Sequence, residues 1–234
     1  MRCRLVIPFV IAMLRPIHGA DMRFASGTSA LAIPFDLHGN NIYLSVSVNE
    51  SRPLSFLLDT GASHSILSLQ HARSFEMSLE RLDKVDRGIG AAYPDPYLIT
   101  DSVSFHLPGV TFSGDKAVAI SLDSARKCLQ SAGTVARDID GIFGQDFLSK
   151  AVVVIDYPAR RINLYAPENY SYTGKGTSLA LEIDSQLLFV RAQLKAPGRQ
   201  PVTASWWSIP ALRQRYRSPG SSRRPTNGCR QTKT

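Results

Sequence analysis

The chain has 234 residues, of which 44% are hydrophobic and 20% are charged, a balance typical of a globular protein and not of a disordered one. Its 16 Gly and 14 Pro follow no period and it has only 3 Cys, which excludes a collagen-like fibre and a disulfide scaffold. The net charge of +8 comes from the two ends of the chain. Residues 1–20 contain three Arg, residues 206–234 contain six Arg and one Lys, and neither segment contains an acid, so residues 21–205 carry a net charge of −2.

The N-terminus has the pattern of an export signal. Arg2 and Arg4 precede an apolar stretch from Leu5 to Leu14, and His18-Gly19-Ala20 offers a cleavage site. The apolar stretch is too short to span a bilayer, so we expect no stable membrane anchor. The pattern predicts that residues 1–20 are a signal peptide and that the protein is exported, periplasmic or secreted. The alternative is an N-terminal strand.

The cysteines do not predict a disulfide or a metal site. Cys3 lies in the predicted signal peptide and Cys229 in the basic tail, which leaves Cys128 alone in the body of the chain. We therefore expect no intrachain disulfide, no metal and no cofactor.

The body of the chain has the pattern of an all-β protein. Short apolar or alternating segments recur every 8–12 residues between turn residues, which favours a barrel or a sandwich. Residues 70–82 form the best helical candidate, and Gly88-Ile89-Gly90 opens a Pro-rich hairpin region. The expected strands are 33–37, 42–48, 54–58, 103–107, 117–120, 152–156 and 162–165.

One strand delivers a carboxylate to a tight loop. The apolar segment Phe56-Leu57-Leu58 runs directly into Asp59-Thr60-Gly61-Ala62-Ser63, where Gly and small residues allow another segment to approach closely. This sequence resembles the active-site loop of retropepsin-like aspartic proteases. The segment Asp140-Gly141-Ile142-Phe143-Gly144 strengthens the likeness, because it resembles the hydrophobic-hydrophobic-Gly segment that packs behind that loop, ahead of a short helix.

The resemblance covers roughly residues 30–170 and most resembles the bacterial exported branch of the family. It implies an all-β fold, a single-lobe closed β-barrel with short helices, with a lobe from 28 to 170. It also implies that Asp59, Thr60 and Gly61 are catalytic, with the Thr60 hydroxyl joining two catalytic loops. Ala62 would contact the substrate, as would Gly88, Ile89 and Gly90 from a flap over the cleft.

Such enzymes hydrolyse peptide bonds with two Asp side chains that share a proton, one acting as base toward water and one as acid. The resemblance therefore implies an aspartic endopeptidase acting on peptide or protein substrates. Because this chain contains a single Asp-Thr-Gly, the partner Asp must come from a homodimer or from a second lobe. The alternative function is a catalytically incomplete lobe, vestigial or peptide-binding.

The C-terminal third contains an apparent start of a second lobe. Residues 188–194, a turn with Pro197-Gly198 and residues 201–204 echo residues 42–48, the turn with Pro53 and the strand that leads to Asp59. We expect residues 171–205 to be a linker and the first strands of this lobe. Residues 206–234 are then a basic tail, either disordered or out of frame.

The genetic code allows the out-of-frame interpretation. If codons 206–213 are read from the third base of each codon, they admit Val-Val-Asp-Thr-Gly-Ala-Ser, which is the motif missing from this lobe. A frameshift near codon 205 is therefore our hypothesis. Binding of nucleic acid by the Trp206-Trp207 pair is the weakest alternative, and we expect no nucleic-acid partner.

Three other features receive structural interpretations. Ser63 and His64 are adjacent on a loop and lack the closing Gly of a nucleophile elbow, so we expect them not to face each other. Cys128 has no activating neighbour. We assign Asp146 to a helix start and Asp156 to a strand end.

Overall fold

The computed structural model describes residues 21–39, 41–82, 96–114, 117–123, 125–126, 138–175, 179–184, 187–195, 198 and 200–207. The predicted signal peptide at 1–20, the predicted flap residues Gly88, Ile89 and Gly90, and Cys128 lie outside this part of the chain. Export and the flap therefore stay predictions.

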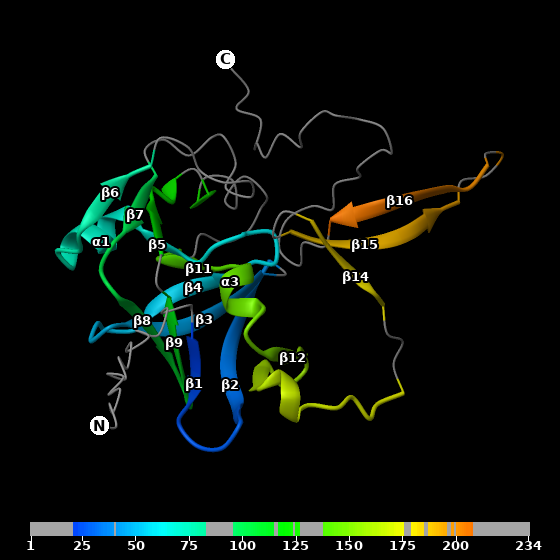
Figure 1. The fold of residues 1–234 in the computed structure, drawn as a ribbon, viewed down its shortest axis with the longest axis horizontal. Helices are drawn as coiled ribbons and strands as arrows, with labels where there is room; N and C mark the ends of the chain where they lie inside the picture. The colour runs from blue at the N-terminus through cyan, green and yellow to red at the C-terminus, as the bar shows by residue number, and fades with distance from the viewer. Residues whose placement is uncertain are drawn as a thin grey trace, which may run out of the picture.

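The fold consists of short strands with few helical turns, which confirms the all-β prediction (Figure 1). The elements are β1 Asp21–Phe24, β2 Ser29–His38, β3 Asn41–Val48, β4 Leu54–Leu58, β5 Ile66–Ser68, α1 Leu69–Ser74, β6 Leu79–Arg81, β7 Tyr97–Ile99, β8 Val103–Leu107, β9 Val110–Gly114, β10 Val118–Ile120, β11 Gly141–Phe143, α3 Gln145–Leu148, β12 Val152–Asp156, β13 Arg161–Tyr165, the 3-10 turn η1 Pro167–Asn169, β14 Leu181–Asp184, β15 Leu187–Leu194 and β16 Val202–Trp207.

The described residues form two sheets. The larger has 13 strands in the order β1-β9-β8-β3-β4-β11-β5-β10-β7-β6, and a branch through β2, β13 and β12 starts at β3. The smaller sheet contains β14, β15 and β16 and lies to one side of the larger one in Figure 1. Strand β11 pairs in parallel with β4 and antiparallel with β5, so it lies between the two strands that flank the Asp59 loop.

The core of the large sheet is rich in phenylalanine. Phe143 on β11 stacks on Phe147 of α3 with ring centroids 4.1 Å apart, and Phe112 meets the Phe147 ring edge-on at 5.4 Å. Phe56, Phe105, Phe112 and Phe143 are fully buried and Phe147 nearly so. Burial of each such ring stabilises the folded state by about 1.5–3 kcal/mol. This cluster fixes β4, β11 and α3 against one another.

The helix expected at residues 70–82 is wrong over most of its length. Helix α1 ends at Ser74, and residues 79–81 form β6. Glu76 has φ of 54°, a left-handed conformation that cannot continue a right-handed helix. The chain then turns, and β6 pairs with β7.

Candidate active site

Asp59 follows β4 directly and sits at the start of a tight turn. Its backbone N–H donates to the Phe143 carbonyl at 3.0 Å, which continues the parallel pairing of β4 with β11 by one residue. The Gly61 N–H donates to Asp59 Oδ1 at 2.8 Å, and the Ala62 N–H donates to the Asp59 carbonyl at 3.2 Å. The carboxylate is therefore held over its own loop.

The Asp59 carboxyl is only partly exposed. Loss of solvent raises its pKa above the ordinary value of 3.8, because burial disfavours the charged form, while the hydrogen bond from the Gly61 N–H acts in the opposite direction. A carboxyl with a raised pKa keeps its proton to a higher pH than an ordinary carboxyl does.

The segment after β11 packs behind the Asp59 loop, as the sequence predicted. A Cβ on Gly144 would lie 2.6 Å from the His64 carbonyl oxygen and 2.7 Å from that of Ala62. Only glycine permits this close approach of two backbones. The Gln145 N–H donates to the Ala62 carbonyl at 2.8 Å, and Gln145 Nε2 donates to the Thr60 carbonyl at 3.1 Å.

Asp146 fixes the far end of the same loop. Its two carboxylate oxygens accept from the Ser65 N–H and from the Ser65 hydroxyl, both at 2.8 Å, and Oδ1 also accepts from the Phe147 N–H. Asp146 is the second residue of α3, which confirms the helix-start assignment. Asp156 ends β12, also as assigned.

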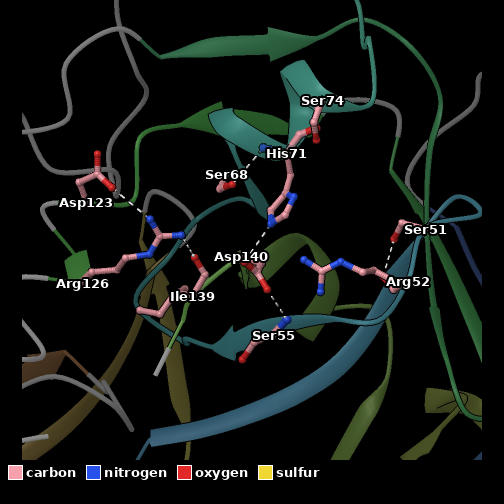
Figure 2. Close-up of polar contacts among 10 residues, drawn as sticks. All are labelled: Ser51, Arg52, Ser55, Ser68, His71, Ser74, Asp123, Arg126, Ile139 and Asp140. Atoms are coloured by element: carbon pink, nitrogen blue, oxygen red, sulfur yellow. Dashed lines mark hydrogen bonds and ion pairs between the residues drawn. The ribbon is translucent and has the colours of Figure 1, made fainter. Parts of the chain in front are cut away.

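A second clamp was missed in the sequence. Asp140 Oδ2 accepts from the Ser55 N–H at 2.9 Å and Oδ1 lies 2.9 Å from His71 Nε2, so this carboxylate joins β4 to α1 (Figure 2). The Asp140 and His71 side chains are 14% and 16% exposed, so the pair is shielded from solvent. The position of Asp140 directly before a buried strand is the signal in the sequence that points to this clamp. The sequence alone does not identify its partner His71, which lies 69 residues away.

The neighbouring arginine supports the same segment. Arg126 donates to the Ile139 carbonyl at 2.8 Å and to Asp123 at 3.0 Å (Figure 2). The two residues directly before β11 are thereby held by different contacts. Arg126 binds the Ile139 carbonyl, and Asp140 is held by the contacts described above.

The expectation for Ser63 and His64 is wrong in one respect. The Ser63 hydroxyl and His64 Nδ1 lie 2.9 Å apart, because the tight loop turns both side chains to the same side. Ser63 is 1% exposed, however, so its hydroxyl is not open to a substrate. The pair is therefore a structural hydrogen bond of the Asp59 loop.

Of the predicted site residues, the structure describes those of the Asp59 loop, whereas Gly88, Ile89 and Gly90 lie outside the described residues. Asp59, Thr60, Gly61 and Ala62 lie together on one loop, of which Thr60 is half-buried and Gly61 and Ala62 are buried. Neither Asp140 nor Asp146 serves as the second carboxylate in this structure, because both oxygens of each are engaged elsewhere. Among the described residues, no cluster of three or more metal-ligating side chains is present. The same part of the chain contains no helix with the length and hydropathy needed to cross a membrane.

Comparison with known proteins agrees with this geometry. A family profile described as "Aspartyl protease" matches residues 44–147, which include both the Asp59 loop and the segment behind it. No curated protein matches the chain.

Ten chains of known structure are similar to this chain, among them the two that follow. One is a retropepsin-like aspartic protease from Rickettsia conorii, at 15% identity and a TM-score of 0.37, over 63% of this chain and 93% of that one. The other is the retroviral protease-like domain of Ddi1 from Leishmania major, at 18% identity and a TM-score of 0.34, over 62% and 98% of the respective chains. The part of the chain that forms the Asp59 site is therefore similar in sequence to aspartyl proteases.

Proposed function

We propose that this protein is an aspartic endopeptidase in which Asp59 is one half of a catalytic pair of carboxylates. The observation that supports the proposal is the placement of Asp59, whose pKa is raised by burial and whose loop is held by hydrogen bonds from β11 and α3. Such a site keeps a carboxyl in fixed geometry and ready to exchange a proton near the working pH.

In the proposed reaction the ionised member of the pair takes a proton from water as the water oxygen attacks the peptide carbonyl carbon. The protonated member donates its proton to the carbonyl oxygen, which gives a tetrahedral diol. The C–N bond then breaks as the amine nitrogen takes a proton from the pair and one hydroxyl of the diol returns its proton to the pair, which leaves a carboxylic acid, a free amine and the pair with its one proton. No covalent bond forms between enzyme and substrate.

The second carboxylate comes from outside the lobe in this proposal. Asp140 and Asp146 are the acids of the segment packed behind the Asp59 loop, and both hold backbone N–H groups and side chains instead of facing a substrate. The partner Asp is therefore supplied by a second copy of the chain or by a second lobe.

The test is peptide cleavage by the purified protein, its Asp59→Asn variant and an Asp21→Asn control. Asp21 is an exposed acid whose carboxylate pairs with Arg23, so its replacement leaves the Asp59 loop intact. We expect cleavage of a mixed peptide library by the wild type and the control, and a loss of at least about a hundredfold in the Asp59→Asn variant. Undiminished cleavage by Asp59→Asn would overturn the proposal.

The source of the partner carboxylate is read from the same assay. A homodimeric site predicts that turnover per chain rises with protein concentration over the range in which dimers form. A two-lobed chain predicts turnover that is independent of concentration. A monomer that binds peptides and cleaves none would identify the lobe as a catalytically incomplete, peptide-binding module.

A further inference from the structure

The small sheet repeats the first hairpin of the large sheet pair for pair. In the large sheet Phe35 lies opposite Leu44 and His38 opposite Asn41, and adding 146 to each number gives Leu181 opposite Val190 and Asp184 opposite Leu187. All four pairs of β2 with β3 are reproduced in this way by β14 with β15. The connection between the strands is two residues long in both hairpins, 39–40 and 185–186.

The second hairpin is repeated as well. Tyr43 lies opposite Leu57, and Phe189, its equivalent on β15, lies opposite Trp207 on β16. All four pairs of β3 with β4 recur when 146 is added to the β3 number and 150 to the β4 number, as in Val46 with Leu54 and Ala192 with Ala204. The four-residue difference is absorbed by the longer turn before β16.

The side-chain pattern follows the same alignment. Phe35-Asp36-Leu37-His38 corresponds to Leu181-Glu182-Ile183-Asp184, so apolar and polar residues fall at the same positions. Residues 42–48 correspond likewise to residues 188–194. Side chains alternate between the two faces of a strand. Equivalent residues of the two copies therefore face the same way only because the strand register is also the same.

The burial of equivalent residues differs between the two copies. Phe35 is 5% exposed, but its equivalent Leu181 is 53% exposed, and Val48 is 1% exposed where Leu194 is 48% exposed. In the first copy these side chains are covered by the remainder of the lobe. Within the part of the chain that the structure describes, these two apolar positions of the small sheet therefore lack the cover that their equivalents have.

The alignment identifies the position that corresponds to the catalytic Asp. Because β4 maps onto β16 with an added 150, Asp59 corresponds to position 209, two residues after Trp207. That position holds Ile209, followed by Pro210 and Ala211 in place of Thr60 and Gly61.

One added base changes this result. Trp is encoded only by TGG, so a base N inserted before codon 206 makes that codon NTG, which encodes Leu, Met or Val for any N. The next two codons become GTG and GTC, both Val, if Ser208 uses a TC codon. Codons 209 to 213 then admit Asp-Thr-Gly-Ala-Ser, which places the Asp at position 209.

The restored strand matches the first copy throughout. The first copy reads Leu54-Ser55-Phe56-Leu57-Leu58 before Asp-Thr-Gly-Ala-Ser. The second reads Ala204-Ser205, followed in the shifted frame by three apolar residues and by five codons that admit the same five residues. The strand pairing selects position 209, and the codons admit Asp at that position when one base is inserted. Insertion of one base also preserves the spacing of the first copy, because it leaves three residues between Ser205 and the new Asp, as there are between Ser55 and Asp59.

We propose that β14–β16 begin a second protease lobe, and that its Asp-Thr-Gly is encoded at codons 209–211 one base out of the printed frame. The complete protein then carries both carboxylates of the pair in one chain. The catalytic part of this inference rests on the proposed function, whereas the repeat and the reading frame do not.

The test is made on the protein from its natural source and on its gene. Trypsin cuts after Arg199, and the next peptide of the printed frame ends at Arg213. We expect mass spectrometry to find instead a peptide that starts at Gln200 and continues into Val-Val-Asp-Thr-Gly-Ala-Ser. An independent genomic read of codons 200–215 should contain the extra base. Detection of the printed peptide 200–213, or a genomic read that matches the printed frame, would overturn the inference.

Activity measurements separate this inference from the proposed function. The frame-restored chain is compared with its Asn variant at position 209 and with its Asp59→Asn variant. We expect concentration-independent turnover in the restored chain, and a loss of at least about a hundredfold in each variant. A restored frame without turnover would contradict the proposed function alone. Turnover by a dimer of the printed chain, with the printed frame verified, would support the function and overturn the second lobe.

Discussion

Both oxygens of the Asp146 carboxylate accept hydrogen bonds from Ser65, one from its backbone N–H and one from its hydroxyl, each at 2.8 Å. Ser65 lies at the end of the Asp59 loop and is 1% exposed, so water cannot replace these contacts. The loop that carries Asp59 is therefore positioned by an acid that lies 81 residues away from Ser65 in the chain.

The Asp146→Ala substitution should destabilise the protein. It leaves two buried donors of Ser65 without an acceptor, which costs about 2–4 kcal/mol of unfolding free energy. Urea denaturation measures this change. Asp156→Ala is the matched control, because Asp156 is exposed and accepts only from a turn N–H at 2.9 Å. We expect the control to lose less than about 1 kcal/mol. Equal losses in the two variants would show that Asp146 does not clamp the loop.

The Gly144→Ala substitution should impair both the fold and the site. The new methyl group would lie 2.6–2.7 Å from two backbone oxygens of the Asp59 loop, so the loop must shift. We expect a loss of about 1–3 kcal/mol in unfolding free energy and of at least about tenfold in peptide turnover.

Gly114→Ala is the control for this substitution, since its Cβ would meet nothing nearer than Phe112 at 3.9 Å. The control should retain turnover and stability. If Gly144→Ala behaved like Gly114→Ala, the close packing of β11 and α3 behind the loop would be refuted.

The Asp59→Asn substitution should stabilise the folded protein at neutral pH. The folded-state pKa of Asp59 lies above the ordinary 3.8, so the native state loses stability as pH rises from 3.8 through that raised value. Asn carries no charge to desolvate and lacks this loss, while its side-chain oxygen can still accept from the Gly61 N–H.

Calorimetry at two pH values measures the effect. We expect the variant to melt a few degrees above the wild type at pH 7, and the two melting temperatures to converge below pH 3.8. An Asp21→Asn control should show no such pH-dependent difference. A wild type that melts above the Asp59→Asn variant at pH 7 would contradict the desolvation of this carboxyl.

Local sequence predicted several strands and the tight loop at Asp59 well. Strand β4 was expected at its observed bounds, because its apolar run ends sharply at Asp59, and β8 and β12 were likewise expected at theirs. The packing of Gly144 behind the loop was also predicted, from the resemblance of residues 140–144 to the segment that packs behind the active-site loop of aspartic proteases. Within each of these segments the residues that carry the signal are neighbours in the chain.

The failures concern features that depend on distant contacts or on backbone conformation. The clamp between His71 and Asp140 joins residues from different elements, and no local pattern pairs them. Helix α1 was expected to continue past Ser74, because the sequence does not reveal the left-handed conformation of Glu76. The contact of Ser63 with His64 was missed for the same reason, since it depends on the tight turn of the loop.

The pH dependence of kcat/KM for peptide cleavage tests the central claim most directly. A pair of carboxyls that includes Asp59 must hold one proton, so activity should be lost at low pH, where both are protonated, and at high pH, where both are ionised. We predict a bell-shaped profile with its maximum on the acid side of neutrality. Cleavage that increases to a plateau above neutral pH would contradict a shared-proton pair at Asp59.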